Sequence, residues 1–224
     1  MTTRVKSIEP AANGTQVPDK GQHLLIEPIR PKILDITIEG LTPLVVNAWS
    51  KKAIQMMIAK QTGKHRQKKE AKDPEKDYLE SLYMSKDGWT GIPAGGMKGC
   101  LVNACRVVEG LPMTLAKRII FVESQGISVA HGKQLVRVNG THHIHEEMVR
   151  IDGGKTADIH FRAMYELPWE IRFDVTFLEN IVSAEQMCNL IELAGYVEGL
   201  CEHRPGSPYS NTGDRGRFRI KRSV

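Results

Sequence analysis

The chain has 224 residues, of which 41% are hydrophobic and 25% charged, a composition that fits one globular domain of moderate size with insertions. The formal net charge of +5 permits a nucleic-acid partner. No apolar stretch approaches the roughly eighteen residues that cross a bilayer, which argues against a membrane protein, and we expect no secretory leader. Four cysteines lack the spacing of a zinc site and predict reduced thiols in a cytoplasmic protein.

The N-terminal residues 1–32 are expected to form a flexible segment, because they are largely polar, lack periodicity and contain several prolines and glycines. Residues 33–224 are predicted to form the folded domain. Its first strand is expected at 33–39, where the sequence ILDITIE alternates, and it ends at Gly40. The apolar segment LTPLVVNAWS then leaves the sheet.

A polar helical insertion is predicted at about 47–88, with a new helix starting at Asp73-Pro74, where proline suits the first helical position. Positions 60–72 are rich in Lys and Arg and contain a single acid, Glu70. With the basic C-terminus, this gives two separated basic clusters, a pattern that suits contact with a phosphate backbone. The alternative is a pair of solvated basic segments. The candidate binding residues in this insertion are Lys51, Lys52, Lys64, Arg66, Lys68 and Lys69.

A glycine-rich loop is predicted to open directly onto a helix at 97–108. Pro93 and the pair Gly95-Gly96 form the loop, and the helix carries Lys98 and Arg106. Free backbone N–H groups, the helix dipole and a cation would converge there on an anion. The segment is not a P-loop, because the GKS or GKT sequence is missing. A simple tight turn is the alternative.

Strands are expected from residue 118 onward, with a hairpin-like insertion at about 126–157 that turns at Asn139-Gly140. Two further strands, at 157–166 and 169–179, are predicted to pair around Leu167-Pro168. The second of these alternates, with Ile171, Phe173, Val175 and Phe177 on one face.

An amphipathic helix then begins after Ser183, with Gln186 in the capping-box position, and is expected to end at Gly195. A short closing strand follows at 216–222. With the insertions removed, the order is β-α-β-β-α-β, which predicts an α+β fold of the ferredoxin-like or modified RRM type. The three tryptophans Trp49, Trp89 and Trp169 lie beside turns and are expected to cover the core.

The loop between the last helix and the closing strand is the main candidate binding site. Its glycines, such as Gly199, allow a ligand to approach the backbone closely. Arg204, Arg215 and Arg217 carry planar guanidinium groups that match phosphate. Aromatic side chains in the same region were candidates for stacking on bases, namely Tyr196, Tyr209 and Phe218. The alternative is a polar loop whose arginines pair with local acids.

Three sequence features together resemble the RAMP superfamily, and in particular the Cas7-like backbone subunit of CRISPR effector complexes. They are a strand followed by TPL, the segment IPAGGMKG, and a final helix that leads through AGYVEGLCEHRP to GDRGRF. The resemblance is one of pattern and covers roughly residues 33–45 and 89–222. Phages and mobile elements also carry solitary proteins of this kind.

The resemblance implies a modified RRM-type palm that binds a guide RNA backbone independently of sequence, in antiviral defence. It also implies head-to-tail stacking into a helical filament, with other effector subunits and a target DNA or RNA as further partners. The glycine-rich loop and the C-terminal loop would face the guide, and the basic insertion would meet nucleic acid or the next subunit. No cofactor or metal is expected.

Some Cas7-like proteins cut RNA with an Asp after the first strand, but LTPLVVNAWS contains no acid, so we expect a binder without catalysis. A Cas6-like RNA-processing endoribonuclease remains an alternative, because His142, His143 and His145 lie beside two glutamates and Cas6-type enzymes use a histidine as general base. The same residues could hold a metal, although a strand would turn His142 away from the other two. A phage-encoded Cas7 mimic or structural protein is a further alternative.

Overall fold

The computed structural model describes residues 28–63, 71–151, 156–208 and 210–222. The fold is α+β, with three antiparallel sheets and few helices. The main sheet has the order β11-β1-β10-β5, with β1 at Pro31–Gly40, β5 at Ile120–Val122, β10 at Glu170–Leu178 and β11 at Phe218–Ile220. The first strand therefore begins two residues before the predicted start. This sheet is compatible with the expected RRM-like fold.

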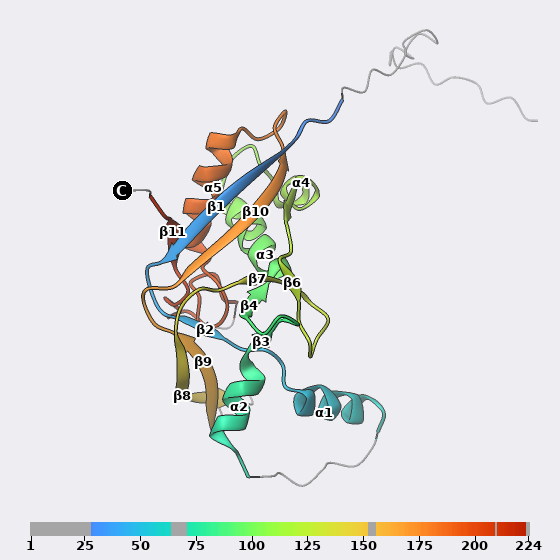
Figure 1. Cartoon of the computed structure of the whole chain (residues 1–224), viewed down its shortest axis with the longest axis vertical. Helices are drawn as coiled ribbons and strands as arrows, with labels where there is room; N and C mark the ends of the chain where they lie inside the picture. The colour runs from blue at the N-terminus through green and yellow to red at the C-terminus, as the bar shows by residue number, and fades with distance from the viewer. Residues whose placement is uncertain (1–27, 64–70, 152–155, 209, 223–224) are drawn as a thin grey trace, which may run out of the picture.

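Two helices, α3 at Ala94–Ala104 and α5 at Ala184–Val197, cover one face of the main sheet, behind β1 and β10 in Figure 1. Strand alternation explains why: Ile36 and Ile38 of β1 point inward and are buried. In β10 the predicted apolar face is confirmed, since Ile171, Phe173, Val175 and Phe177 are all at most 1% exposed. The capping box of α5 at Ser183 and Gln186 is also confirmed.

The opposite face of the main sheet is charged. Nε of Arg172 donates to Oδ1 of Asp35 at 2.8 Å, and Nε of Arg219 lies 2.6 Å from Oε1 of Glu39. The exposed aromatic ring of this face, Phe121, lies at the edge strand β5. Such a surface offers mutually neutralised charges rather than a row of rings on which bases could stack.

The third sheet is built around a long hairpin of β8 at His142–Ile151 and β9 at Thr156–Tyr165, to which β2 at Leu44–Val46 adds. The predicted pairing of 157–166 with 169–179 is therefore wrong, because β9 pairs with β8 and β10 pairs with β1. Alternation shows which residues face the core, but it carries no information about the partner strand.

The second sheet, β3-β4-β7-β6, joins short strands: β3 at Tyr83–Met84, β4 at Thr90–Pro93, β6 at Gly126–Ile127 and β7 at Gln134–Arg137. The predicted Asn139-Gly140 turn thus links strands of two different sheets rather than a hairpin. Helix α4 at Met113–Ile119 was not predicted, and a 3₁₀ turn η1 at Cys105–Val107 follows α3. None of the helices in the described part of the chain is long and apolar enough to cross a membrane.

The predicted insertion contains α1 at Lys51–Gln61 and α2 at Pro74–Ser81, both far from the main sheet in Figure 1. Asp73 caps α2 by accepting from the backbone N–H of Lys76 at 3.2 Å, as the Asp-Pro signal predicts. Helix α2 packs against β9 of the hairpin. The helix ends at Ser81, because Tyr83 and Met84 already belong to β3.

Candidate nucleic-acid interface

The two predicted binding loops meet at one cavity of 350 Å³. Helix α3 contributes Gly96 and Gly99, and the C-terminal loop contributes Gly199 and Arg204. These segments are about a hundred residues apart in the sequence, and the packing of α3 on α5 brings them together. The structure therefore joins, in one hollow, the two features that the sequence analysis selected separately.

The glycines of α3 lie within the helix and not in a loop, which corrects the prediction. Helix α3 begins at Ala94 with Pro93 as its N-cap, and no side chain caps its first turn. A Cβ added at Gly95 or Gly99 would meet no atom within 4 Å, so packing does not require glycine at either position. Glycine in a helix costs about 1 kcal/mol relative to alanine. Gly96 and Gly99 leave the helix backbone without side chains where it lines the cavity.

The C-terminal loop is held rigidly against the segment that follows β1. The hydroxyl of Thr42 donates to the carbonyl of Asp214 at 2.9 Å and accepts from the N–H of Arg217 at 3.0 Å. Cys201 and His203 both have positive φ angles, 61° and 54°, which L residues adopt at some cost. A loop fixed in such a conformation can hold its side chains ready for a ligand.

One acid and one arginine line the cavity, Glu202 and Arg204, and the buried acid Glu198 lies beside them in the chain. Glu198 is 6% exposed, and its Oε2 has no hydrogen-bond partner among the described residues. Burial raises the pKa of Glu198, while Arg106 and Arg204 lower it. Arg204 also donates from Nη1 to the carbonyl of Cys201 at 2.7 Å, which fixes the guanidinium at the cavity wall.

Burial disfavours the thiolate form of the two cysteines that line the cavity. Burial raises the pKa of Cys201 to about 12, with Glu202 adding to the rise. Burial likewise raises the pKa of Cys100, whose Sγ donates to the carbonyl of Ala194 at 3.6 Å. The protonated thiol is thus favoured at both positions, and it is the weaker nucleophile.

The remaining predicted binding residues that the structure describes do not line this cavity. Nζ of Lys98 lies 4.1 Å from the ring centroid of Phe121, and Arg217 stacks over Tyr196 at 4.7 Å. Nη1 of Arg215 donates to Nε2 of His145 at 2.9 Å. Lys51 and Lys52 are the first residues of α1. The predicted residues Lys64, Arg66, Lys68 and Lys69, and also Tyr209, lie outside the described residues.

Two of the aromatic predictions are wrong. Phe218 is 1% exposed and belongs to the core, so it cannot stack on a base. Trp169 is buried as expected, but Trp49 is 55% exposed and lines the cavity.

The prediction that α5 ends at Gly195 is also wrong, because the helix continues to Val197. Position 195 is glycine because a Cβ there would clash with the carbonyl oxygen of Phe218.

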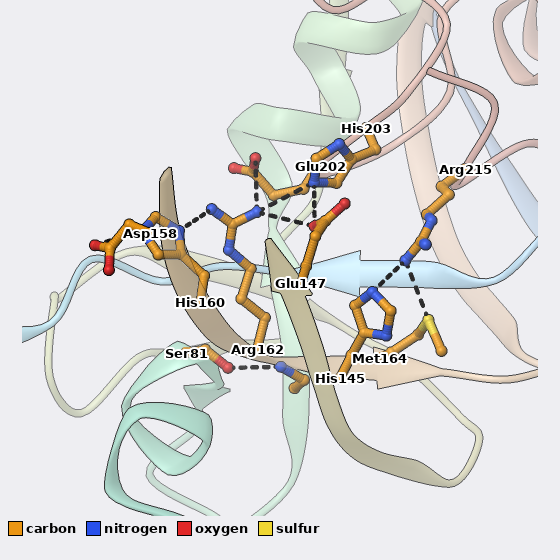
Figure 2. Close-up of polar contacts among 11 residues, drawn as sticks. Ser81, His145, Glu147, Asp158, His160, Arg162, Met164, Glu202, His203 and Arg215 are labelled. Atoms are coloured by element: carbon orange, nitrogen blue, oxygen red, sulfur yellow. Dashed lines mark hydrogen bonds and ion pairs between the residues drawn. The ribbon is translucent and has the colours of Figure 1, made fainter. Parts of the chain in front are cut away.

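A second polar cluster, centred on Arg162, joins the C-terminal loop to the hairpin (Figure 2). Arg162 is 8% exposed, and its Nη2 donates to Nδ1 of His160 at 2.8 Å. Nε2 of His203 lies 2.7 Å from Oε2 of Glu147, and the guanidinium of Arg162 lies close to both of these atoms. The same guanidinium lies 3.6 Å from Oε2 of Glu202. The hydrogen bond of His203 Nε2 is with Nη1 of Arg162 at 3.2 Å, whereas Oε2 of Glu147 is a close ion-pair neighbour that has no hydrogen-bond partner among the described residues.

The three histidines of the GTHHIHEE segment point to different neighbours. Nδ1 of His142 lies 2.7 Å from the hydroxyl of Tyr78 on α2, and burial lowers the pKa of His142. Nε2 of His143 lies 3.8 Å from Glu166, whereas His145 contacts Arg215. In the parts of the chain that the structure describes, no group of three or more His, Cys, Asp or Glu is placed to hold a metal ion.

Sequence reasoning missed the polar residues of the cavity, Asn47 and Asn103, and the whole Arg162 cluster. A signal for Asn103 exists, because Gly96, Gly99 and Asn103 are spaced three and four residues apart and so share one helix face. Asn47 directly follows the buried strand β2, where a polar residue marks the exit from the core. Nothing in the local sequence of Arg162 distinguishes it from a solvated strand residue.

Comparison with known proteins gave matches to solved structures alone: no family model and no curated protein matches the sequence, whereas 27 solved chains match the structure. One belongs to a structure described as the type III-B Cmr-beta bound to cognate target RNA, with 12% identity and a TM-score of 0.46. The match covers 86% of this chain, which spans 59% of the length of that one. Another is Cmr6 from Pyrococcus furiosus, with 9% identity and a TM-score of 0.39, covering 87% of this chain and 100% of that one.

Proposed function

We propose that this protein binds single-stranded RNA through its sugar-phosphate backbone, as a non-catalytic, Cas7-like RAMP subunit of a CRISPR-type effector assembly. The observation that carries the proposal is the cavity shared by the glycine-lined start of α3 and the arginine-bearing C-terminal loop. In this reading both loops grip the same stretch of backbone. The proposed role in a CRISPR-type effector assembly rests on the sequence resemblance to the RAMP superfamily.

An anion suits the start of α3 for two physical reasons. The first N–H groups of a helix have no intrahelical acceptor, and the helix dipole places partial positive charge there. No side chain caps this end, and the absence of Cβ atoms on its glycines lets a phosphate come close. Arg204 faces the same space from the other wall, with a fork that matches phosphate oxygens.

A polymer suits the site better than a free anion, because cationic groups continue beyond the cavity. Arg106, in the 3₁₀ turn after α3, is exposed and close enough to influence Glu198. Lys51 and Lys52 begin α1, two residues after the cavity residue Trp49. Arg106 would let a backbone that leaves the cavity continue along the surface after α3.

The proposal excludes catalysis at the loop that follows β1. That loop carries no acid, and its Thr42 is committed to holding Asp214 and Arg217. The carbonyl of Thr42 also accepts from Nε1 of Trp169 at 2.8 Å. A residue with this many structural contacts serves to position the C-terminal loop rather than to move a proton.

We further infer that the main sheet with α3 and α5 is an RRM-type β-α-β-β-α-β palm, and that copies stack head to tail along the RNA. The strand order β11-β1-β10-β5, with α3 between β1 and β5 and α5 between β10 and β11, supports this reading. Other effector subunits and a target strand would join the same assembly in the cytoplasm. A phage-encoded mimic of this fold would bind in the same way.

Fluorescence anisotropy with a labelled single-stranded RNA tests the proposal. We expect binding that weakens steeply with salt, and a salt slope reduced by about one when Arg204 is replaced by alanine. Arg219→Ala is the matched control, because it removes the same charge on the opposite face of the sheet. Absence of binding to every single-stranded oligonucleotide at low salt would overturn the proposal.

One observation favours RNA cleavage as a second candidate function. Glu147 faces Nε2 of His203 at 2.7 Å, which leaves Nδ1 of an oriented imidazole available for proton transfer. Incubation with labelled RNA in EDTA distinguishes this candidate. Products ending in a 2′,3′-cyclic phosphate, lost in His203→Ala, would favour cleavage, and intact RNA at equal occupancy would favour the binder.

A further inference from the structure

We propose that the cavity receives one nucleobase of the bound RNA and reads its edge, so that each copy of the protein prefers a purine at one position. This inference rests on the proposed RNA-binding function and departs from purely sequence-independent binding. A base, and not only backbone, is the occupant because the cavity offers both hydrogen-bond donors and hydrogen-bond acceptors. It also has an exposed aromatic ring beside helix backbone that carries no side chains.

The size of the cavity fits a single nucleotide. Its 350 Å³ lies at the low end of the range of about 300–1,000 Å³ that small-ligand sites occupy. Its walls come from the residues after β2, the strands β3 and β4, the exposed face of α3 and the C-terminal loop. A cavity built from several packed segments keeps its shape when empty, so the site is already formed before a base enters.

The two carboxamides of the cavity have no hydrogen-bond partner among the described residues. These side chains, of Asn47 and Asn103, both line the cavity and are half-buried. A half-buried amide without a partner is unfavourable unless water or a ligand satisfies it. Because each carboxamide offers a donor and an acceptor, the pair suits a ligand whose edge also carries both.

A purine matches these groups better than a pyrimidine. Asparagine pairs bidentately with N6 and N7 of adenine, and arginine pairs with O6 and N7 of guanine. Asn47, Asn103 and Arg204 supply both kinds of group around one space. Pyrimidines lack N7 and can form only one of the two hydrogen bonds of such a bidentate pair. The cavity should therefore bind purines in preference to pyrimidines.

Aromatic and bare surfaces complete the site. Trp49 is 55% exposed at the cavity, so its ring can stack on an entering base, whereas Tyr83 is 7% exposed and forms part of the wall. Gly96 and Gly99 leave the α3 wall without side chains, which gives room for the larger purine ring and for its phosphate. The larger ring also gains more from stacking.

The test compares four twelve-residue RNAs, an oligouridine and the same strand with one central adenine, guanine or cytosine. We expect the adenine and guanine strands to bind roughly fivefold or more tightly than the other two, the effect of one bidentate base contact. The double variant Asn47→Ala/Asn103→Ala should lower the ratio of the affinity for the adenine strand to the affinity for oligouridine. Asn180→Ala, an exposed asparagine outside the cavity, is the matched control.

The outcomes separate this inference from the proposed function. Tight binding of all four strands with equal affinity would overturn the base-reading cavity and leave RNA binding intact. Failure of every strand to bind would remove the proposed function and this inference with it. A double variant that changes the oligomeric state, with base preference unaltered, would assign the cavity to a side chain of a second copy and overturn the inference.

Discussion

Nε2 of His203 in the C-terminal loop lies 2.7 Å from Oε2 of Glu147 on strand β8. This contact and the buried Arg162 beside it tie the loop that bears Arg204 to the long hairpin (Figure 2). The loop is tied on its other side to Thr42, next to β1. The position of the cavity wall therefore depends on both the main sheet and the hairpin.

Loss of the central guanidinium should destabilise the protein. Arg162→Met removes a cation that is 8% exposed and faces Glu147 and Glu202 at 3.8 and 3.6 Å. Leaving partly buried carboxylates without their cation costs about 3 kcal/mol in comparable pairs. Urea unfolding followed by circular dichroism measures the change. Arg172→Ala, whose ion pair lies exposed on the outer sheet face, should have little effect, and equal losses in both variants would contradict the assignment.

The same cluster makes stability depend on pH. Burial, followed by neighbouring Arg215, lowers the pKa of His145, and burial, followed by Arg162, lowers that of His160. The unfolded chain, with histidine pKa values of about 6.5, thus binds more protons than the folded one as pH falls below that value. Stability should be full above pH 6.5 and decrease as pH falls through the folded-state pKa values.

Thermal unfolding at pH 7.5, 6.5 and 5.5 checks this sign. His160→Gln keeps a side-chain acceptor for Arg162 but cannot titrate in this range, so its Tm should fall less over the interval than that of the wild type. His143→Gln is the control, because this imidazole is half-exposed and faces Glu166 at 3.8 Å. A wild-type Tm that rises on acidification would contradict the prediction.

The glycines of α3 and α5 should respond oppositely to the same substitution. Gly99→Ala places a Cβ in open space and should stabilise the protein by about 1 kcal/mol, while it narrows the cavity and weakens RNA binding. Gly195→Ala should instead destabilise the protein, because its Cβ would clash with the carbonyl of Phe218. Chemical unfolding and RNA anisotropy on both variants separate the two roles. An alanine at position 99 that leaves affinity unchanged would remove that position from the interface.

Sequence reasoning succeeded where a structure depends on neighbours along the chain. The capping box at Ser183 and the Asp-Pro start of α2 are signals within one helical turn, and the alternation of β10 reports directly which side is buried. Helix and strand faces of this kind follow from periodicity alone.

It failed where the outcome depends on distant partners. The pairing of β9 with β8 rather than β10 is decided by the hairpin as a whole, and the burial of Arg162 by the loop that folds over it. The glycine pair Gly95-Gly96 suggested a loop, because the cost of glycine in a helix is evident in sequence and the open cavity beside it is not. Asn47 and Asn103 come to line the same cavity only through tertiary packing.

The buried acid beside the cavity should oppose RNA binding. Burial raises the pKa of Glu198, with Arg106 and Arg204 acting against that rise, so the carboxylate gains a proton earlier than an exposed one as pH falls. Protonation removes a negative charge next to the proposed phosphate path, so affinity should rise on acidification. Glu198→Gln should mimic the protonated state and tighten RNA binding at pH 7.5 by about threefold, as expected for one screened charge interaction.

Anisotropy titrations between pH 5 and 8 at fixed ionic strength check this prediction. The wild-type affinity should converge on that of Glu198→Gln at low pH, and the variant should lack this part of the pH dependence. Glu185→Gln, in the first turn of α5 and away from the cavity lining, is the charge-matched control. If Glu198→Gln bound RNA more weakly than the wild type while unfolding at the same urea concentration, Glu198 would instead be a group that holds Arg204 in its binding position.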